Sequence, residues 1–397
     1  MKLLFLTQVL DLQHGVLGFV VRWVEEFAKH VESVRVVALE VGDTTGLPDN
    51  VEWLEIGREG RILRYFKYKS ALNQALGRDG YDAVLAHMVP RYALVAAGPA
   101  KRHGARLYLW YTHKGVDARL IKAVPLTLKT FSASEESLRV SGPNRVITGH
   151  GIDTDHFDLV APEERPRLIE HYKRILSVGR LTPAKDPLCV LRCIRHLLDQ
   201  GLEVALDWVG GGLTKSDEGF SGEVRREIAS LDLADHVTLH GEVPYAADIL
   251  LESDRPFAEA LAARAATHAG RVTLLGAVPH VRVAQTMRRA RLLVNTSHTG
   301  SVDKVVLEAM AARRPALSCN DSFPVIFDAL PESTGRSQAF FFPAGDAQAL
   351  AAKLTALVER GPEELAEIGE HLRELVVREH GVEALCERLI RHMEPGS

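Results

Sequence analysis

The fold can be read outward from residues 297–315, whose sequence is SHTGSVDKVVLEAMAARRP. Residues 292–295 before them predict the end of a buried strand, and the small polar residues 296–301 predict a loop. An apolar helix is expected to begin near Asp303, with Ser301 as its N-cap and with the Asp303 charge suited to the positive end of the helix. Because the first N–H groups of a helix have no partner within it, this helix start can hold a phosphate.

Glu308 lies one turn further into the expected helix, among apolar neighbours. A carboxylate is costly to bury unless it finds partners. The residues alone leave two interpretations open: Glu308 lies on the solvent-exposed face of the helix, or it serves a ligand bound at the helix start.

The stretch resembles the end of the E-x7-E signature of GT4-type retaining glycosyltransferases with the GT-B fold. In particular it resembles a branch that reads T-G-S-L/V-D-K-x-V-L-E-A-M-A. In that family the second Glu accepts hydrogen bonds from the ribose of the donor nucleotide, and Glu308 matches it. The first Glu would fall at Gly300, so the resemblance implies that Gly300, Ser301 and the following amides hold the donor sugar through backbone groups. Arg313 stands where the family usually has Gly. The other donor contacts implied for this stretch are Thr299, Val302, Asp303 and Lys304.

Composition limits the class of protein. A length of 397 residues suggests two domains or three. The net charge of −4 gives no push toward nucleic acid, and no nucleic-acid partner is expected. No apolar run reaches the roughly 18 residues of a membrane span, and the N-terminal apolar run is too short for a signal peptide. Cys189 and Cys193, one helical turn apart, are interpreted as buried thiols rather than metal ligands, which fits a reduced, cytoplasmic setting.

Strand and helix patterns alternate through the first part of the chain. Strands are expected at 2–6, 34–39, 82–86, 106–110, 127–132 and 145–148, helices at 18–30, 61–78 and 90–102, and a loop at 7–17. This alternation predicts a doubly wound parallel sheet, which binds ligands at the carboxyl ends of its strands.

Several polar residues follow those strands. Gly15 lies in the loop after the first strand; a G-x-x-G spacing alone favours an ordinary turn, but the family has a glycine-rich loop here that touches donor diphosphate and acceptor. His87 and His113 end or follow strands, and the residues alone favour packed or surface roles for them. By resemblance, His113 matches the histidine beside the donor sugar, and His87 a variable position facing the acceptor. Lys114 and Asp117 are expected to join them.

Residues 58–69 interleave basic residues with Ile62, Leu63, Tyr65 and Phe66. Such a helix can lie on anionic lipid at the inner membrane face. The alternative is a solvated basic face over a packed apolar one, so peripheral membrane contact is a hypothesis.

The second α/β pattern begins after a charged linker at 158–172. Asp153 and Asp155, just before the linker, form a D-x-D that we do not interpret as a metal site, because GT-B enzymes usually work without one. Arg180 and Lys185 lie in a strand-to-helix loop, and alone they would be two solvated surface charges. They match the family pattern G-R-x-x-x-x-K, whose cations grip the donor diphosphate as its charge grows.

Further donor contacts are implied downstream. Gly210 and Gly211 match a glycine-rich turn near the phosphates and base. Residues 236–244 are echoed by 271–279, and the second copy has the family spacing, which places the base site near Val278. A final amphipathic segment at 382–393 closes the chain.

The resemblance therefore predicts the GT-B fold, with two doubly wound Rossmann-like domains facing across a cleft. Residues 1–160 would form the acceptor-side domain, 161–375 the nucleotide-sugar-binding domain, and 376–397 a helix packed back on the first. The implied enzyme is a retaining hexosyltransferase that moves a sugar from a nucleotide diphosphate to an acceptor hydroxyl in glycan, glycolipid or polysaccharide assembly. Its expected catalytic residues are His113, Arg180, Lys185 and Glu308, and no cofactor or metal is expected.

Two alternatives stay open. A GT-B sugar-nucleotide epimerase would act on the donor without an acceptor. A sugar-nucleotide-binding module without transferase activity would fit the loss of the first Glu at Gly300.

Overall fold

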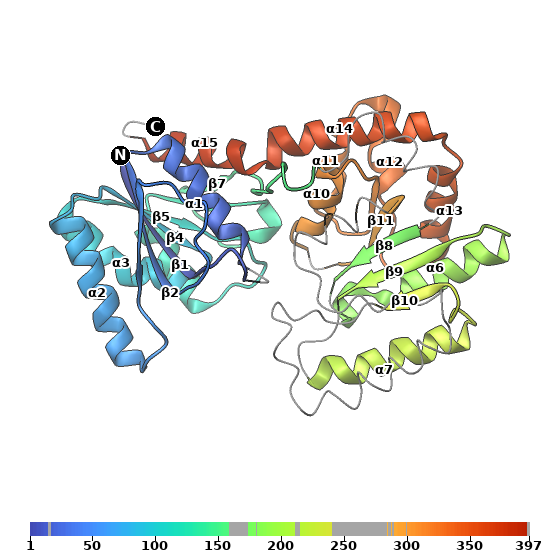
Figure 1. Ribbon diagram of the computed structural model, residues 1–397, viewed down its shortest axis with the longest axis horizontal. Coiled ribbons are helices and arrows are strands. Elements are labelled where there is room, and N and C mark those ends of the chain that lie inside the picture. Colours follow the sequence, from blue (N-terminus) through green and yellow to red (C-terminus); the bar gives the residue numbers. More distant parts are fainter. Residues whose placement is uncertain are drawn as a thin grey trace. The chain divides into compact units, whose positions relative to one another are not determined.

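The computed structural model describes residues 1–14, 17–158, 174–179, 181–210, 215–239, 284, 287, 290–298 and 300–394. The chain divides into two compact units. Unit 1 comprises Met1–Asp153, Gly300–Val302 and Arg378–Ser397, and unit 2 comprises Thr154–Thr299 and Asp303–Val377. Each unit contains one parallel sheet with helices around it, which confirms the predicted α/β class (Figure 1).

Unit 1 holds a sheet of seven parallel strands in the order β3-β2-β1-β4-β5-β6-β7. Its strands are β1 (Lys2–Leu10), β2 (Ser33–Val41), β3 (Val51–Glu55), β4 (Ala83–His87), β5 (Arg106–Trp110), β6 (Lys129–Ser132) and β7 (Arg145–Ile147). Its helices are α1 (Phe19–His30), α2 (Arg61–Gly77), α3 (Pro90–His103), α4 (Ala118–Ala123) and α15 (Val382–Met393), with short 3-10 helices η1 (Val124–Leu126) and η2 (Glu135–Ser137).

Strands β1, β4 and β5 are buried on both faces, which is why they read as continuous apolar runs. Along β1, Leu3 and Phe5 point to a core shared with α1 and α15. Leu4 and Leu6 point to the opposite core, which α2, α3 and α4 complete. Period-two alternation along one strand therefore supplies both cores.

Two details differ from the sequence-based expectation. Strand β1 runs to Leu10, through residues expected to be a loop, because β2 continues beside it and Leu10 pairs with Val41. Strand β3 was not predicted. It is the edge strand, and four of its five residues are exposed, so its sequence carries no burial pattern.

Unit 2 holds a parallel sheet of five strands in the order β10-β9-β8-β11-β12. Its strands are β8 (Arg174–Val178), β9 (Ala205–Val209), β10 (Val237–Leu239), β11 (Leu292–Asn295) and β12 (Ala316–Ser318). Its helices are α6 (Pro187–Asp199), α7 (Lys215–Ser230), α10 (Lys304–Ala311), α11 (Pro324–Phe327), α12 (Arg336–Phe340), α13 (Ala347–Val358) and most of α14 (Pro362–His380), with short 3-10 helices η4 (Pro183–Lys185) and η5 (Glu332–Thr334).

The last helix, α15, belongs to unit 1 although it follows unit 2 in the sequence (Figure 1). Leu385, Cys386 and Leu389 are fully buried in the core that contains α1. Its large apolar stripe explains this placement, because an amphipathic helix must bury that stripe against another element.

Within the described residues we find no helix whose length and apolar character would suit a membrane span. Cys189 and Cys193 lie on α6 and are buried free thiols.

Candidate functional site

The carboxyl edge of the unit 2 sheet brings two loops together. The chain leaves β8 toward β9 and β10 on one side, and later returns to β11 and β12 on the other. The gap between β8 and β11 is therefore a topological switch point, where open α/β sheets bind their ligands. The loop after β8 carries Lys185, and the loop after β11 leads to Asp303.

Lys185 is the cation at the centre of this edge. Its Nζ lies 2.7 Å from Oδ1 of Asp303 and donates to Oγ of Ser297 at 3.0 Å. The backbone is fixed as well, since Thr296 Oγ1 donates to the Lys185 carbonyl oxygen at 2.6 Å. Only 20% of the Lys185 side chain and 12% of the Asp303 side chain are exposed. The pair is thus largely removed from water, and the ammonium has few alternative positions.

The start of α10 differs from the expectation in its N-cap residue. Asp303 is the residue that precedes α10, so the N-cap is Asp303 rather than Ser301. Its side chain makes no capping hydrogen bond. Instead, the second carboxylate oxygen accepts from Nδ2 of Asn320 at 3.0 Å. Asp303 is therefore an anion that holds Lys185 at the carboxyl edge of the unit 2 sheet.

Helix α10 itself carries two charged residues. Lys304 and Glu308 are one turn apart and partly buried. Burial lowers the pKa of Lys304 to about 8, and the nearby Glu308 carboxylate acts in the opposite direction. A bound diphosphate would favour the protonated form of Lys304 in the same way, since an opposite charge within a few ångströms raises the pKa of an amine.

Arg313 ends α10 in an unusual way. Its φ is +58°, a left-handed conformation that favours glycine and is normally costly for other residues. Its guanidinium is held by Glu370, with Nε 2.8 Å from Oε2, and by Asp158 at 2.5 Å. These ion pairs offset the cost of the left-handed backbone. They explain how an arginine occupies the position where the GT4-type family usually has glycine.

His113 lies in unit 1, in the loop after β5, and is exposed. Its Nδ1 accepts a hydrogen bond from the Gly115 N–H at 2.9 Å. In the neutral ring the proton is therefore on Nε2, which is available as a donor. A Cβ at Gly115 would lie only 2.8 Å from Nδ1, so this geometry requires glycine.

His87 ends β4 and is 2% exposed. Its ring lies against three aromatic side chains, with centroid separations of 5.6 Å to Phe5, 5.9 Å to Phe19 and 5.4 Å to Trp23. This is the packed role that the residues alone favoured. Contact of His87 with an acceptor stays a prediction.

The other predicted positions are distributed over both units. Gly210 has φ +125° and Gly300 has φ +71°, backbone that favours glycine. Lys114 is exposed, Ser301 is partly buried and Val302 is buried. Asp117 caps α4 through Oδ1. Gly15, Arg180, Gly211, Val278 and Thr299 lie outside the described residues, as does most of the repeated segment 236–279.

The two aspartates before the linker face different arginines. Asp153 pairs with Arg22 at 3.4 Å, whereas Asp155, whose side chain is 99% exposed, lies 3.9 Å from Arg373. In the described part of the chain, no group of three or more His, Cys, Asp or Glu residues is placed to hold a metal ion.

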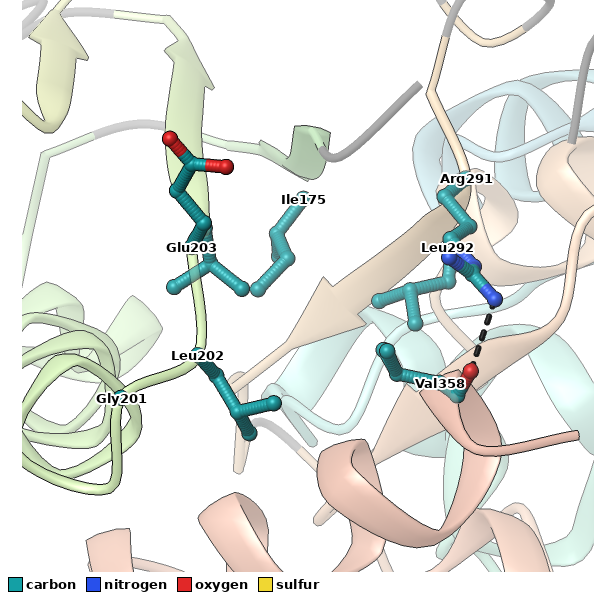
Figure 2. A pocket seen from close by; sticks show the side chains of 8 residues that line it. Ile175, Gly201, Leu202, Glu203, Arg291, Leu292 and Val358 are labelled. Carbon is teal, nitrogen blue, oxygen red and sulfur yellow. Dashed lines mark hydrogen bonds between the residues drawn. The ribbon is translucent and has the colours of Figure 1, made fainter. Parts of the chain in front are cut away.

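A cavity of about 320 Å³ in unit 2 lies at the opposite edge of the sheet (Figure 2). Ile175, Val204 and Leu292 line it near the amino ends of β8, β9 and β11. Arg291 closes one side by donating to the Val358 carbonyl oxygen at 2.8 Å. Because parallel sheets bind ligands at their carboxyl edge, we do not assign this cavity to the site around Lys185.

Sequence reasoning had not identified Ser297, Thr296 or Asn320. Each directly follows a strand at the carboxyl edge, or lies one residue beyond it, and that position was the available signal. Small hydroxyl and amide side chains are common in such loops, so their types alone did not distinguish them.

Comparison with known proteins bears on the identity of this chain. Residues 250–360 match the family described as "Glycosyl transferases group 1". A comparison with curated proteins found no match. Among solved structures, Alr3699/HepE of Anabaena, crystallised with UDP and glucose, is similar with a TM-score of 0.66, 16% identity and 99% of each chain covered.

Two further solved structures are similar over the same length. A glycosyltransferase from Rickettsia africae has a TM-score of 0.69 and 15% identity, with 100% of each chain covered. Sucrose-phosphate synthase from Thermosynechococcus elongatus has a TM-score of 0.65 and 17% identity, with 99% of this chain and 98% of that chain covered. At these identities the likeness concerns the fold. The full-length agreement shows that the chain shares the GT-B fold of these structures, and its residues 250–360 are similar to the group 1 glycosyltransferases.

Proposed function

We propose that this enzyme transfers a hexosyl group from a UDP-sugar to an acceptor hydroxyl, with retention of the anomeric configuration. The observation that carries the proposal is Lys185, a mostly buried ammonium held at the switch point of the unit 2 sheet by Asp303 and Ser297. A cation placed there in advance stabilises a diphosphate leaving group without reorganisation during the reaction.

UDP is the proposed nucleotide because similar structures hold it. Alr3699/HepE has been crystallised with UDP and with UDP-glucose. In this chain, Lys185 and Arg180 would bind the diphosphate. Glu308 would accept hydrogen bonds from the ribose, and the backbone of residues 299–304 would hold the sugar. Gly210, Gly211 and Val278 would lie near the phosphates and base.

The donor and the acceptor would be bound by different parts of the chain. Residues 161–375 would bind the donor, and residues 1–160, with the helix at 376–397, would bind the acceptor. His113 would donate from Nε2 to a sugar hydroxyl, since Gly115 occupies its Nδ1. Retention is proposed to proceed through front-face departure of the diphosphate, whose oxygen takes the proton of the acceptor hydroxyl. Lys114 and the loop containing Gly15 would contact substrate.

A cytoplasmic enzyme in contact with the inner membrane face is part of the same proposal. On α2, Ile62 is 76% and Phe66 61% exposed, which is unusual for large apolar side chains. Lys67 of the same helix is paired with Glu59 at 2.9 Å, which weakens the basic character of this surface. Sedimentation with anionic and with neutral vesicles at low salt tests this membrane contact. Failure to bind either kind of vesicle would refute it.

The enzyme's donor is tested by thermal shift with UDP-, GDP-, ADP- and TDP-sugars, since a ligand that binds only the native state raises the melting temperature. NMR of the product from the stabilising donor and an acceptor panel then reports the anomeric configuration. Donor binding without turnover would favour a binding module without transferase activity. The loss of the first Glu at Gly300 is the observation that supports this alternative. Inverted product would refute retention.

A further inference from the structure

A second cavity, of about 280 Å³, lies in unit 1 at the carboxyl edge of its sheet. Gln8 of β1 and Val89 after β4 line it. In this sheet the chain runs from β1 outward through β2 and β3, and returns to β4 on the other side of β1. The cavity therefore lies at the switch point of unit 1, the position in an open α/β sheet where a ligand is expected.

Three arginines surround this cavity. Arg64 comes from α2, Arg91 from α3 and Arg119 from α4. None of them forms an ion pair with any residue that the structure describes, whereas Arg35 and Arg106 of the same unit are paired with carboxylates. Arginines gathered around one cavity without counter-ions repel each other, and an anion between them removes that cost.

Asp117 is the one acidic residue among the described residues that line the cavity. Its Oδ1 accepts from the backbone N–H groups of Arg119 at 3.0 Å and Leu120 at 2.8 Å. The carboxylate is therefore engaged in capping α4, where the positive end of the helix stabilises it. The cavity keeps an excess of positive charge.

Two tyrosines complete the wall. The rings of Tyr68 and Tyr92 stack with centroids 5.3 Å apart. The Tyr68 hydroxyl is buried and has no hydrogen-bond partner among the described residues. Burial raises the pKa of both tyrosines, so both hydroxyls stay protonated and can donate. A buried donor without an acceptor is costly, and an anionic ligand oxygen would satisfy it.

We infer that this cavity binds an anionic oxyacid group, a phosphate or a carboxylate, and that the group is carried by the acceptor. The guanidinium fork matches the oxygen geometry of both groups, and three such forks with a tyrosine donor form a site for one multiply hydrogen-bonded anion. The assignment to the acceptor rests on the proposed function, whereas the anion site itself does not.

The test is titration of the full chain with methyl phosphate, glucuronate, dihexanoyl phosphatidate below its micelle concentration, and neutral methyl glucoside, followed by NMR. Replacing Arg91 and Arg119 with Gln should weaken binding of the preferred anion at least tenfold, and Tyr68→Phe should weaken it several-fold while keeping the ring stack. The matched control is Arg102→Gln, on the same helix as Arg91 but bonded to Asn73, and it should have no effect.

Preference for phosphatidate would identify an acceptor with a lipid-borne phosphate. Preference for methyl phosphate would identify a small phosphorylated acceptor, and preference for glucuronate would identify an acidic sugar. Anion binding that is unchanged in the Arg91→Gln/Arg119→Gln and Tyr68→Phe variants, or no anion binding at all, would overturn the inference. UDP titration of the same samples separates it from the proposed function. UDP binding without anion binding would reject only the anion site proposed in this cavity. Anion binding that depends on these arginines, with no binding of any UDP-sugar, would reject only the proposed UDP-sugar donor.

Discussion

Replacing Lys185 with alanine should weaken UDP binding by about 10- to 100-fold. The Lys185 ammonium is held by Asp303 at 2.7 Å and by Ser297 at 3.0 Å, so the protein's own side chains fix its position. A hydrogen bond to a charged group contributes about 1.5–3 kcal/mol, and each 1.4 kcal/mol corresponds to about tenfold in affinity. Titration calorimetry with UDP measures this loss directly. The control is Lys353→Ala, which removes a lysine from α13 in the same unit.

The same substitution should also lower stability, and this effect can be separated from binding. Without Lys185, the Asp303 carboxylate, 12% exposed, keeps Asn320 as partner but loses its cation. Discounted for its partial exposure, this loss is about 1–2 kcal/mol. In the double variant Lys185→Ala/Asp303→Asn the uncompensated charge is gone, so stability should recover.

UDP affinity should remain low in that double variant, because the cation is still missing. Asp303→Asn alone should bind UDP at least as tightly as the unmodified enzyme, since the diphosphate no longer competes with a carboxylate for Lys185. UDP affinity unchanged in Lys185→Ala, or restored in the double variant, would refute the assignment of Lys185 to the diphosphate.

Three further predictions follow from single residues. His380 is neutral in the fold, and burial lowers its pKa to about 4, so the unfolded chain takes up a proton that the folded chain does not as pH falls from 6.5 to 4. The contribution of neutral His380 to the free energy of unfolding is therefore fully present above pH 6.5. The free energy of unfolding, measured by urea unfolding followed by fluorescence, should fall by about 3 kcal/mol between pH 6.5 and 4. Arg313→Gly should be more stable than Arg313→Ala by about 1 kcal/mol, because both lose the ion pairs but only alanine keeps the left-handed strain. Gly115→Ala should displace His113 and lower the transfer rate while UDP affinity stays unchanged.

Matched variants decide each of these. His380→Asn keeps an acceptor for the His150 N–H and should flatten the acid-dependent loss; an equal loss in both proteins would reject the assignment. An alanine at position 313 as stable as glycine would show that no strain is stored there. For Gly115, the control is Gly98→Ala, where a Cβ meets open space, and equal transfer rates in the two variants would contradict the account of His113.

Much of the fold could be predicted because it rests on local patterns. Strands such as β4 and β5 are buried on both faces and show as apolar runs, and α15 shows as an amphipathic stripe. Strand β3 carries no such pattern, since its position at the sheet edge leaves most of its side chains in water. Its pairing with β2 depends on backbone hydrogen bonds, which every residue type except proline can donate and accept.

The site was less predictable, because its contacts join residues far apart in the chain. Lys185 could be singled out from its loop, but its partner Asp303 lies 118 residues further along the chain. Asp303 was expected to favour the helix start by its charge, whereas its carboxylate faces Lys185 and Asn320. His87 and His113 both follow strands, and only the tertiary structure shows that the first is packed among aromatic rings and the second is exposed.

A crystal structure of the enzyme with a bound UDP-sugar tests the central claim most directly. We predict that a β-phosphate oxygen lies within hydrogen-bonding distance of Lys185 Nζ, in the place now taken by the Asp303 carboxylate, and that Glu308 accepts from the ribose hydroxyls. A nucleotide bound elsewhere, with the 2.7 Å contact between Lys185 and Asp303 intact, would contradict it.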